Sequence, residues 1–447
     1  MNNILIIGAG RSSSALISYV LNKAKENGWF VTVADQNPIL AEEKIQNHPN
    51  GRATWLDVTK VNDRREMIKR ADLVVSLVPA HLHLELAQDC VNLNKHLITA
   101  SYVSSQMYRM GDVARDKSLI FMNEMGLDPG LDHMSAKQKI DEITEKGGHL
   151  TAFRSYTGGL VAPESNDNPW GYKISWNPAN VVRAGQGTAQ YLENGKLKYI
   201  PYNRLFKQYW NINIDGLGAF EAYANRDSLL YKDIYGLKNI PNILRGTLRY
   251  PGFCKAWDAL IQIGLTDSSY PIVNSLDLTY HDLMEAYVNS SYHSGSSLKE
   301  KIANLLGIST RDEIISKLEW LGLFRKKKIK TENASPAQIL EELLIEKWKL
   351  NRGDKDRVVM HHEFEYDYEG QHFLKTSTLS LNGEDETNTA MSKLVGLPLG
   401  LFVNLVMQEK ITSRGVNIPV QKEVYQPVLE ELKSFGVIFK ENTTPIG

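Results

Sequence analysis

The first third of the chain alternates short, wholly apolar runs with stretches of helical period. The apolar runs occupy residues 3–10, 30–35, 53–58, 71–79, 95–101 and 118–126. Runs without polar alternation are typical of strands that are covered on both faces, and helical crossovers between them make neighbouring strands parallel. The pattern therefore predicts an N-terminal Rossmann fold, which is a doubly wound parallel sheet.

Beyond Gly126 the pattern changes to strand-like pieces separated by long polar loops, then to a mostly helical stretch. A two-stranded pattern and a long helix follow. We expect an α/β protein with a Rossmann dinucleotide-binding domain and a second, mixed α/β domain that an inserted helical subdomain interrupts. The expected boundaries are 1–126 for the first domain, 127–274 with 351–447 for the second, and 275–350 for the helical subdomain.

Composition narrows the class of protein. A net charge of −1 gives no electrostatic case for a nucleic-acid partner. Two cysteines, Cys90 and Cys254, exclude a disulfide framework. His81 and His83 have the spacing of a metal pair, but no third ligand accompanies them, so no metal is expected. The N-terminus lacks a signal-peptide pattern, and the apolar run 394–403 is too short for a bilayer. We expect a cytoplasmic protein.

A glycine-rich turn follows the first apolar run. Gly8 and Gly10 lie between a predicted strand and a predicted helix, where the backbone can approach a pyrophosphate at the helix N-terminus. The third position of the fingerprint is Ser13. Asp35 ends the second predicted strand, where a carboxylate accepts a ribose 2′-OH and repels a 2′-phosphate. Because no lysine or arginine stands beside it, the sequence predicts NAD as the cofactor, with NADP as the alternative.

Polar residues and arginines gather after the later predicted strands. Ser101 and Tyr102 follow the fifth strand, and Asp128 follows the sixth, at the edge where open α/β sheets bind ligands. Arg226 and Arg249 lie in irregular stretches of the second domain, which suits bidentate capture of a carboxylate. A surface ion pair is the structural alternative for either arginine, and a helix cap is the alternative for Asp128. Together they favour an acidic substrate.

Six longer motifs resemble one family, the saccharopine dehydrogenases of the glutamate-forming type. They are "NEMGLDPGLDHM", "SYTGGLVAPESNDNPWGYKISW", "YANRDS", "RGTLRYPGF", "WLGLF" and "MSKLVGLPLGLFVNLVM", in the order of the family. The resemblance implies oxidation of saccharopine by a nicotinamide cofactor to L-glutamate and 2-aminoadipate 6-semialdehyde. It also implies a homodimer formed through the second domain, and last helices that pack on the Rossmann domain. An active site between the domains is expected.

The resemblance also implies which residues bind ligands. The implied cofactor contacts are Gly8, Ala9, Gly10, Arg11, Ser12, Asp35, Gln36, Asn37, Asp57, Val58, Leu127, Asp128 and Pro129. The implied saccharopine contacts are Ser101, Tyr102, Arg226, Thr247, Leu248 and Arg249, and we add Thr157 from the motif beginning at Ser155. Our candidates for proton transfer are Asp128, Tyr102 and Lys173.

Two positions depart from the pattern of this family. The family usually has a basic residue near the end of the second strand and fits NADPH, whereas this chain has Asp35. The family commonly has cysteine where this chain has Thr157. Two other readings stay open: a related amine oxidoreductase, of the lysine 6-dehydrogenase or carboxynorspermidine dehydrogenase type, and a non-catalytic dinucleotide-binding homologue.

Overall fold

The computed structural model describes residues 2–288 and 296–446, so part of the expected helical segment, 289–295, lies outside the described residues. The chain divides into two compact units. Unit 1 contains residues 1–150 and 366–447, and unit 2 contains residues 151–365. This division differs from the expected boundaries, because residues 127–150 and the C-terminal segment group with the first sheet.

Unit 1 is built on a seven-stranded sheet in the order β15-β6-β5-β4-β1-β2-β3, whose pairings are parallel. Its strands are β1 (Asn3–Ile7), β2 (Phe30–Asp35), β3 (Gly51–Trp55), β4 (Leu73–Ser76), β5 (His96–Thr99), β6 (Ile120–Met122) and β15 (Gly415–Asn417). From β1 the strands are added on one side of the sheet up to β3, and from β4 they are added on the other side. The switch point between β1 and β4 is where doubly wound sheets bind nucleotides. The predicted Rossmann fold is confirmed.

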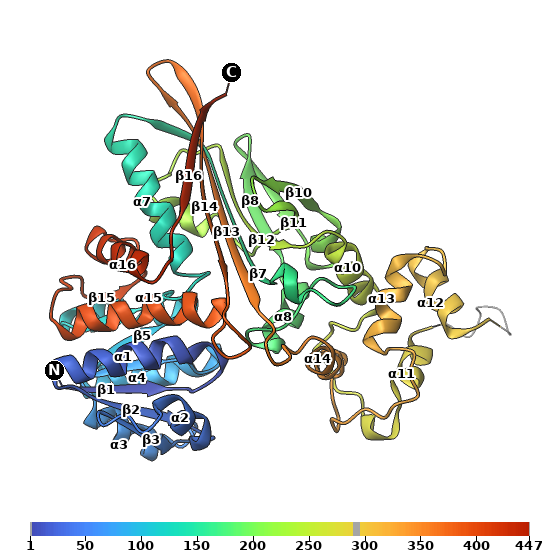
Figure 1. Cartoon of the computed structure of the whole chain (residues 1–447), viewed down its shortest axis with the longest axis horizontal. Helices are drawn as coiled ribbons and strands as arrows, with labels where there is room; N and C mark the ends of the chain where they lie inside the picture. Colours follow the sequence, from blue (N-terminus) through green and yellow to red (C-terminus); the bar gives the residue numbers. More distant parts are fainter. Residues whose placement is uncertain (1, 289–295, 447) are drawn as a thin grey trace. The chain divides into compact units, whose positions relative to one another are not determined.

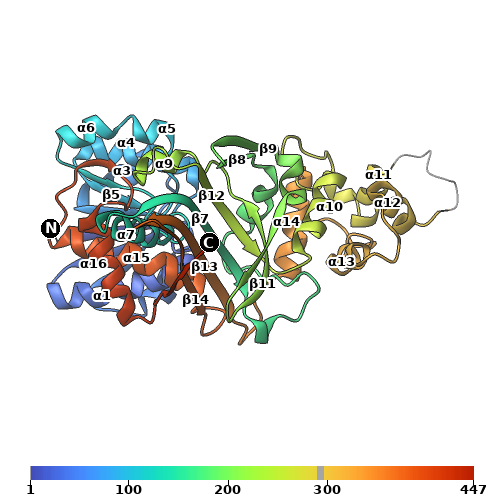
Figure 2. The ribbon, with the colours of Figure 1, turned by 90° about the horizontal axis from the view of Figure 1, so that it is seen from above.

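Helices cover both faces of this sheet. Figure 2 shows α1 and α15 on one face and α4 and α6 on the other. The helices of unit 1 are α1 (Ser14–Asn27), α2 (Pro38–Ile45), α3 (Val61–Arg70), α4 (His83–Leu93), α5 (Ser105–Tyr108), α6 (Gly111–Asp116), α7 (Leu131–Glu145), α15 (Ala390–Met407) and α16 (Lys422–Ser434). Unit 1 also contains the antiparallel pair β14 (Gln371–Asn382) and β16 (Lys440–Pro445).

Helix α15 packs closely along α1 (Figure 1). A Cβ atom at Gly396 would lie 2.6 Å from the backbone nitrogen of Leu16, and one at Gly400 would lie 2.8 Å from the ring of Tyr19. Both glycines therefore permit the close approach. Among the described helices, α15 alone is long and apolar enough to cross a membrane, but 89% of its apolar window is buried inside the structure, as in a core helix.

Unit 2 contains a mixed sheet in the order β10-β11-β12-β7-β13. Its strands are β7 (His149–Val161), β8 (Ala189–Glu193), β9 (Lys196–Ile200), β10 (Tyr209–Ile214), β11 (Gly218–Ala224), β12 (Asn242–Arg249) and β13 (Asp356–Tyr368). Strand β12 is parallel to β7 and antiparallel to β11. β8 pairs with the outer strand β9 and with β12. The second mixed α/β domain is thereby confirmed as part of the fold class.

The helices of unit 2 are α8 (Pro178–Arg183), α9 (Leu230–Ile234), α10 (Phe253–Ile263), α11 (Tyr280–Tyr287), α12 (Leu298–Leu306), α13 (Glu313–Leu321) and α14 (Pro336–Lys347). Three of them, α11, α12 and α14, begin with a capping box. An aromatic core joins the sheet to this helical segment. In this core, the ring centroids of Trp170 and Trp348 lie 5.4 Å apart, and those of the stacked rings of Phe253 and Trp257 lie 5.5 Å apart. Residues 155–161 belong to strand β7, and the loop that follows, residues 162–176, is held by the buried side chains of Trp170 and Tyr172.

Candidate functional site

The glycine turn between β1 and α1 has the geometry that a pyrophosphate requires. Gly8 has a φ of +109°, and a Cβ atom there would lie 3.0 Å from the carbonyl oxygen of Leu77. Gly10 has open space where a Cβ atom would stand, so a ligand can approach its backbone. Ser13 is buried and donates a 2.8 Å hydrogen bond to the carbonyl of Gly10. This hydroxyl closes the turn at the position where many fingerprints have a third glycine.

Asp35 ends β2 and is bound to the same turn. One carboxylate oxygen accepts a 2.7 Å bond from the backbone N–H of Ala9, and the other accepts a 2.8 Å bond from the N–H of Asn37. Asn37 in turn caps α2 by accepting from the N–H of Ile39. The carboxylate is thereby fixed beside the glycine turn, which is where an adenosine ribose lies in this fold.

The remaining residues of the implied nucleotide site have different environments. Hydrogen bonds from the hydroxyl and N–H of Thr59 lower the pKa of Asp57, and Gln36 donates to the same carboxylate at 3.3 Å. Val58 and Leu127 are buried, so their side chains belong to the hydrophobic core. Arg11 and Ser12 stand on the turn itself, Arg11 with an exposed side chain.

Lys44, which the sequence analysis did not single out, also reaches the glycine turn. Its ammonium group, carried by α2, donates to the carbonyl of Gly10 and, at 2.7 Å, to the hydroxyl of Ser13. No local motif marks it, because it lies on the last turn of α2 and not in the segment that directly follows Asp35. The structure thus places a cation where the sequence suggested none.

At the carboxyl edge of the sheet, His83 joins the ends of two strands. Its Nδ1 lies 2.8 Å from the hydroxyl of Ser76 at the end of β4, and its Nε2 lies 2.7 Å from the hydroxyl of Ser101 after β5. Burial lowers the pKa of His83 to about 4, so the ring is neutral near pH 7. Both ring nitrogens are engaged, and the residue positions Ser101.

Tyr102 and Asp128 are brought together at this edge. The Tyr102 hydroxyl donates a 3.1 Å bond to the Asp128 carboxylate. The loop that carries Tyr102 is held by Glu124, which accepts from the N–H of Val103 at 2.9 Å. Helix α7 begins at Leu131, and Gly130, not Asp128, is its N-cap residue. The pair has the composition of a proton-transfer site, a phenol next to a carboxylate.

Arg249, at the end of β12, is a buried cation inside an aromatic cage. It is 3% exposed, and its guanidinium carbon lies 5.0 Å from the ring of Tyr172, 5.3 Å from Phe253 and 5.8 Å from Tyr223. It donates to the carbonyl of Leu248 at 2.8 Å and to the hydroxyl of Tyr223 at 3.4 Å, while its Nε–H has no partner. Among the described residues, no carboxylate lies within ion-pairing distance of it.

Two threonines stand on the same face of the sheet as Arg249. Thr157 of β7 pairs with Thr247 of β12, and Arg249 is the next residue on that face of β12, because strand side chains alternate. The Thr157 hydroxyl is buried without a hydrogen-bond partner. The buried Thr157 hydroxyl and the buried Nε–H of Arg249 are two donors without a partner, and a carboxylate would satisfy both. Leu248, between them in sequence, is fully buried in the core.

Two other predicted residues lie outside this cluster of donors. The Lys173 ammonium bonds to Asp167 at 2.9 Å and to Asp354 at 2.7 Å. Burial alone would lower its pKa, but these two bonds raise it, so the group stays protonated. This favours a structural role for Lys173 over proton transfer. Arg226 lies on the turn after β11 with an exposed side chain and a φ of +52°, and its role stays a prediction.

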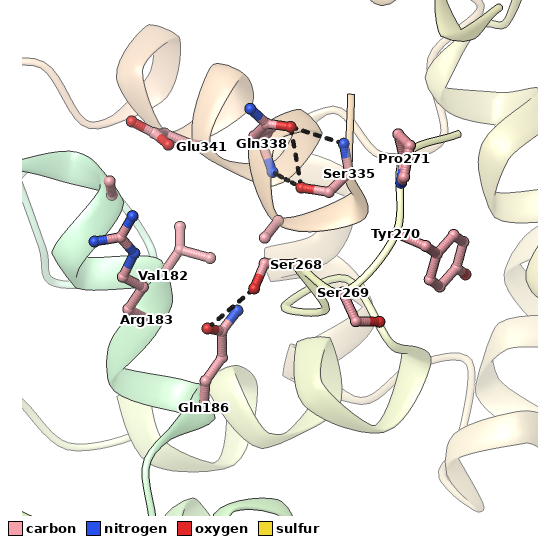
Figure 3. A pocket seen from close by; sticks show the side chains of 12 residues that line it. Val182, Arg183, Gln186, Ser268, Ser269, Tyr270, Pro271, Ser335, Gln338 and Glu341 are labelled. Carbon is pink, nitrogen blue, oxygen red and sulfur yellow. Dashed lines mark hydrogen bonds between the residues drawn. The ribbon is translucent and has the colours of Figure 1, made fainter. Parts of the chain in front are cut away.

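A cavity of about 290 Å³ lies elsewhere in unit 2. Figure 3 shows Arg183 and Gln186 on one side of it and Gln338 and Glu341 of α14 on the other. None of the predicted site residues lines this cavity. The predicted site residues therefore belong to the polar clusters described above and not to this cavity.

The glycine turn with Asp35, together with a second α/β unit that carries a caged arginine, defines a two-unit dinucleotide-binding protein of the Rossmann type. Family models named saccharopine dehydrogenase NADP binding domain and saccharopine dehydrogenase C-terminal domain match residues 4–122 and 126–437. The chain belongs to the saccharopine dehydrogenase family, and its first unit is a nicotinamide-cofactor domain. The resemblance inferred from the sequence motifs is confirmed.

Individual members of this family are similar to the chain over nearly its full length. The chain is 32% identical to saccharopine dehydrogenase [NADP(+), L-glutamate-forming] of Schizosaccharomyces pombe over 99% of both chains. It is 33% identical to the enzyme of the same name from Pyricularia oryzae over 98% of both. The solved structure of apo saccharopine dehydrogenase (L-Glu forming) from Saccharomyces cerevisiae is 30% identical and superposes with a TM-score of 0.86, covering 99% of this chain and 100% of that one.

Proposed function

We propose that the protein is an oxidoreductase that reversibly converts saccharopine, an oxidised nicotinamide dinucleotide and water into L-glutamate, 2-aminoadipate 6-semialdehyde, the reduced dinucleotide and a proton. The observation that carries this proposal is Arg249, a buried cation with no acidic partner among the described residues. An unpaired buried charge is costly, and such sites are built to be completed by a ligand of opposite charge. Saccharopine carries three carboxylates, and the named relatives act on it.

Each polar cluster has a separate task in this reaction. The bound dinucleotide supplies the hydride acceptor, and the chain orients it by the turn at Gly8 and Gly10 and by Asp35. The Arg249 guanidinium and the Thr157 hydroxyl hold a substrate carboxylate. The Tyr102–Asp128 pair accepts the proton released when the secondary amine is oxidised and activates the water that hydrolyses the resulting imine. Ser101, held by His83, gives a further hydrogen bond to the substrate.

For the cofactor we propose NAD⁺ as the ordinary partner, although the named relatives carry NADP(+) in their names. Asp35 supports this proposal, because its carboxylate is fixed on the glycine turn and has lone pairs left for a ribose 2′-OH. The negative charge of the Asp35 carboxylate would repel a 2′-phosphate on the same ribose. Homodimerisation and a cytoplasmic location are further proposals that rest on the family resemblance and the sequence.

The proposed function is tested by turnover with paired cofactors. Purified protein is given saccharopine, L-lysine or polyamine adducts with either NAD⁺ or NADP⁺, and formation of the reduced nicotinamide is followed by its absorbance. We expect turnover with saccharopine only, with a lower KM for NAD⁺ than for NADP⁺. Turnover of lysine or a polyamine adduct in place of saccharopine would identify a related amine oxidoreductase. Nucleotide binding without turnover of any substrate would identify a non-catalytic homologue.

A further inference from the structure

Asp35 and Lys44 have opposite charges and bond to the backbone of consecutive residues of the glycine turn. The Asp35 carboxylate accepts from the N–H of Ala9, while the Lys44 ammonium donates to the carbonyl of Gly10. The two charged groups interact electrostatically, and Asp35 is the strongest source of the interaction that keeps Lys44 charged. One side chain comes from the end of β2 and the other from α2, and they bond to consecutive residues of the turn, Ala9 and Gly10.

The Lys44 ammonium has a donor left for a ligand. An ammonium group carries three N–H donors, and the bonds to Gly10 and Ser13 use two of them. The third is available to an anion bound against the turn. Lys44 is also partly buried, and that burial strengthens any charge-assisted bond that it makes.

We propose that Lys44 determines how the nucleotide site treats the 2′ position of the adenosine, by offsetting the charge of Asp35 and giving the site affinity for a 2′-phosphate that Asp35 alone would repel. The inference builds on the proposed dinucleotide function but is independent of saccharopine. Asp35 recognises a 2′-OH, and Lys44 supplies the counter-charge for a 2′-phosphate. The protein therefore accepts both dinucleotides, and the ratio of the two affinities depends on Lys44.

A purely structural role for Lys44, as a clip on the glycine turn, makes a different prediction. A clip would support the pyrophosphate-binding backbone equally for every adenine nucleotide. A determinant of the 2′ position affects only ligands that carry a 2′-phosphate. Two small nucleotides separate these roles: adenosine 2′,5′-bisphosphate and adenosine 5′-monophosphate.

The experiment measures the affinity of the full-length protein for both nucleotides by titration calorimetry at pH 7. Lys44→Gln keeps a side-chain donor for the Gly10 carbonyl but removes the charge, and Lys44→Met removes both. Lys23→Met is the matched control, because Lys23 stands on α1 in an ion pair with Glu26. We expect both Lys44 variants to weaken the bisphosphate by about tenfold more than the monophosphate, the usual weight of one charge-assisted bond. Lys23→Met should leave both affinities unchanged.

A pH series gives an independent reading. Lys44 is faced by Asp35 from β2, by Glu43 on its own helix and by the backbone of the glycine turn, with Arg11 on that turn. Burial lowers the pKa of Lys44 to about 8, so its charge is present below that pH and is lost above it. The 2′-phosphate has a second pKa of about 6, so it is already mostly doubly ionised at pH 7 and its ionisation does not fall as the pH rises. Affinity for the bisphosphate should therefore fall between pH 7 and pH 9 in the wild type and stay level in Lys44→Gln.

Four outcomes would overturn the inference. Equal losses for both nucleotides in the Lys44 variants would make the residue a structural clip. An identical pH slope in wild type and Lys44→Gln would place the titrating group elsewhere. Failure of the wild-type protein to bind either nucleotide would overturn the proposed dinucleotide function together with this inference, whereas unchanged selectivity in the variants, with normal binding, would overturn only the role of Lys44.

Discussion

Arg249 differs from another arginine of the same sheet in its partners. Arg154 on β7 bonds to Glu365 at 2.6 Å and to Glu363 at 3.4 Å, so its charge is neutralised within the protein. Arg249 has aromatic rings and one carbonyl around it. Replacing a buried, unneutralised charge by an apolar side chain is often neutral or stabilising, whereas removing one partner of an ion pair leaves the other uncompensated.

We therefore predict opposite effects for two matched substitutions. Arg249→Met should leave the free energy of unfolding unchanged or higher when no ligand is present, yet raise the KM for saccharopine by about 10- to 100-fold, because a charged hydrogen-bond partner of the substrate is lost. Arg154→Met should lower the free energy of unfolding and leave that KM nearly unchanged. Urea unfolding and steady-state kinetics measure both quantities. An Arg249→Met protein with normal KM would remove Arg249 from the substrate site.

Two glycines, Gly396 and Gly400, allow helix α15 to pack closely on α1. Its glycines let it lie against the backbone of α1, and α1 follows the glycine turn of the proposed nucleotide site. Gly396→Leu would drive a side chain into the backbone at Leu16, where a Cβ atom alone comes within 2.6 Å.

We predict that Gly396→Leu lowers the free energy of unfolding by about 1–3 kcal/mol or more, as overpacking does, and weakens nucleotide binding because the start of α1 shifts. Gly187→Ala is the control, because Gly187 has open space around a Cβ position and a negative φ. Thermal unfolding with and without dinucleotide measures both effects. Equal stability of Gly396→Leu and the wild type would show that α15 can move away at no cost.

Which features the sequence could predict depended on whether their signal was local. The first six strands of the parallel sheet and the turn at Gly8 and Gly10 have local patterns, and both were predicted. Strand β15 has three residues and no alternation, and it is defined only by its pairing with β6. The ion pair between Lys173 and Asp354 joins distant segments, so a residue that looked chemically available is in fact neutralised. The same reason hid Lys44, whose partners belong to another element.

The two units do not follow one another along the chain, because unit 2 is inserted between the two segments of unit 1. Unit 1 takes its β15, α15 and α16 from beyond residue 366, whereas unit 2 is one continuous segment, residues 151–365. A fragment that ends at residue 150 would therefore expose the face of α1 that α15 covers and lack one strand of the sheet.

We predict that a fragment of residues 151–365 unfolds cooperatively on its own, whereas residues 1–150 do not fold alone or bind dinucleotide. Joining residues 1–150 to 366–447 by a flexible linker should restore binding, because the missing helix and strand are then present. Circular dichroism and nucleotide titration measure both results. A folded, nucleotide-binding fragment 1–150 would contradict the prediction.

The interrupted path of unit 1 also has a consequence for protein synthesis. The ribosome completes the whole of residues 151–365 before β15 and α15 exist. Unit 2 can fold before β15, α15 and α16 of unit 1 have been made. The apolar face of α1 is uncovered during that interval. The face of α1 that α15 covers in the folded protein is therefore accessible in the nascent chain until residues 390–407 have been made.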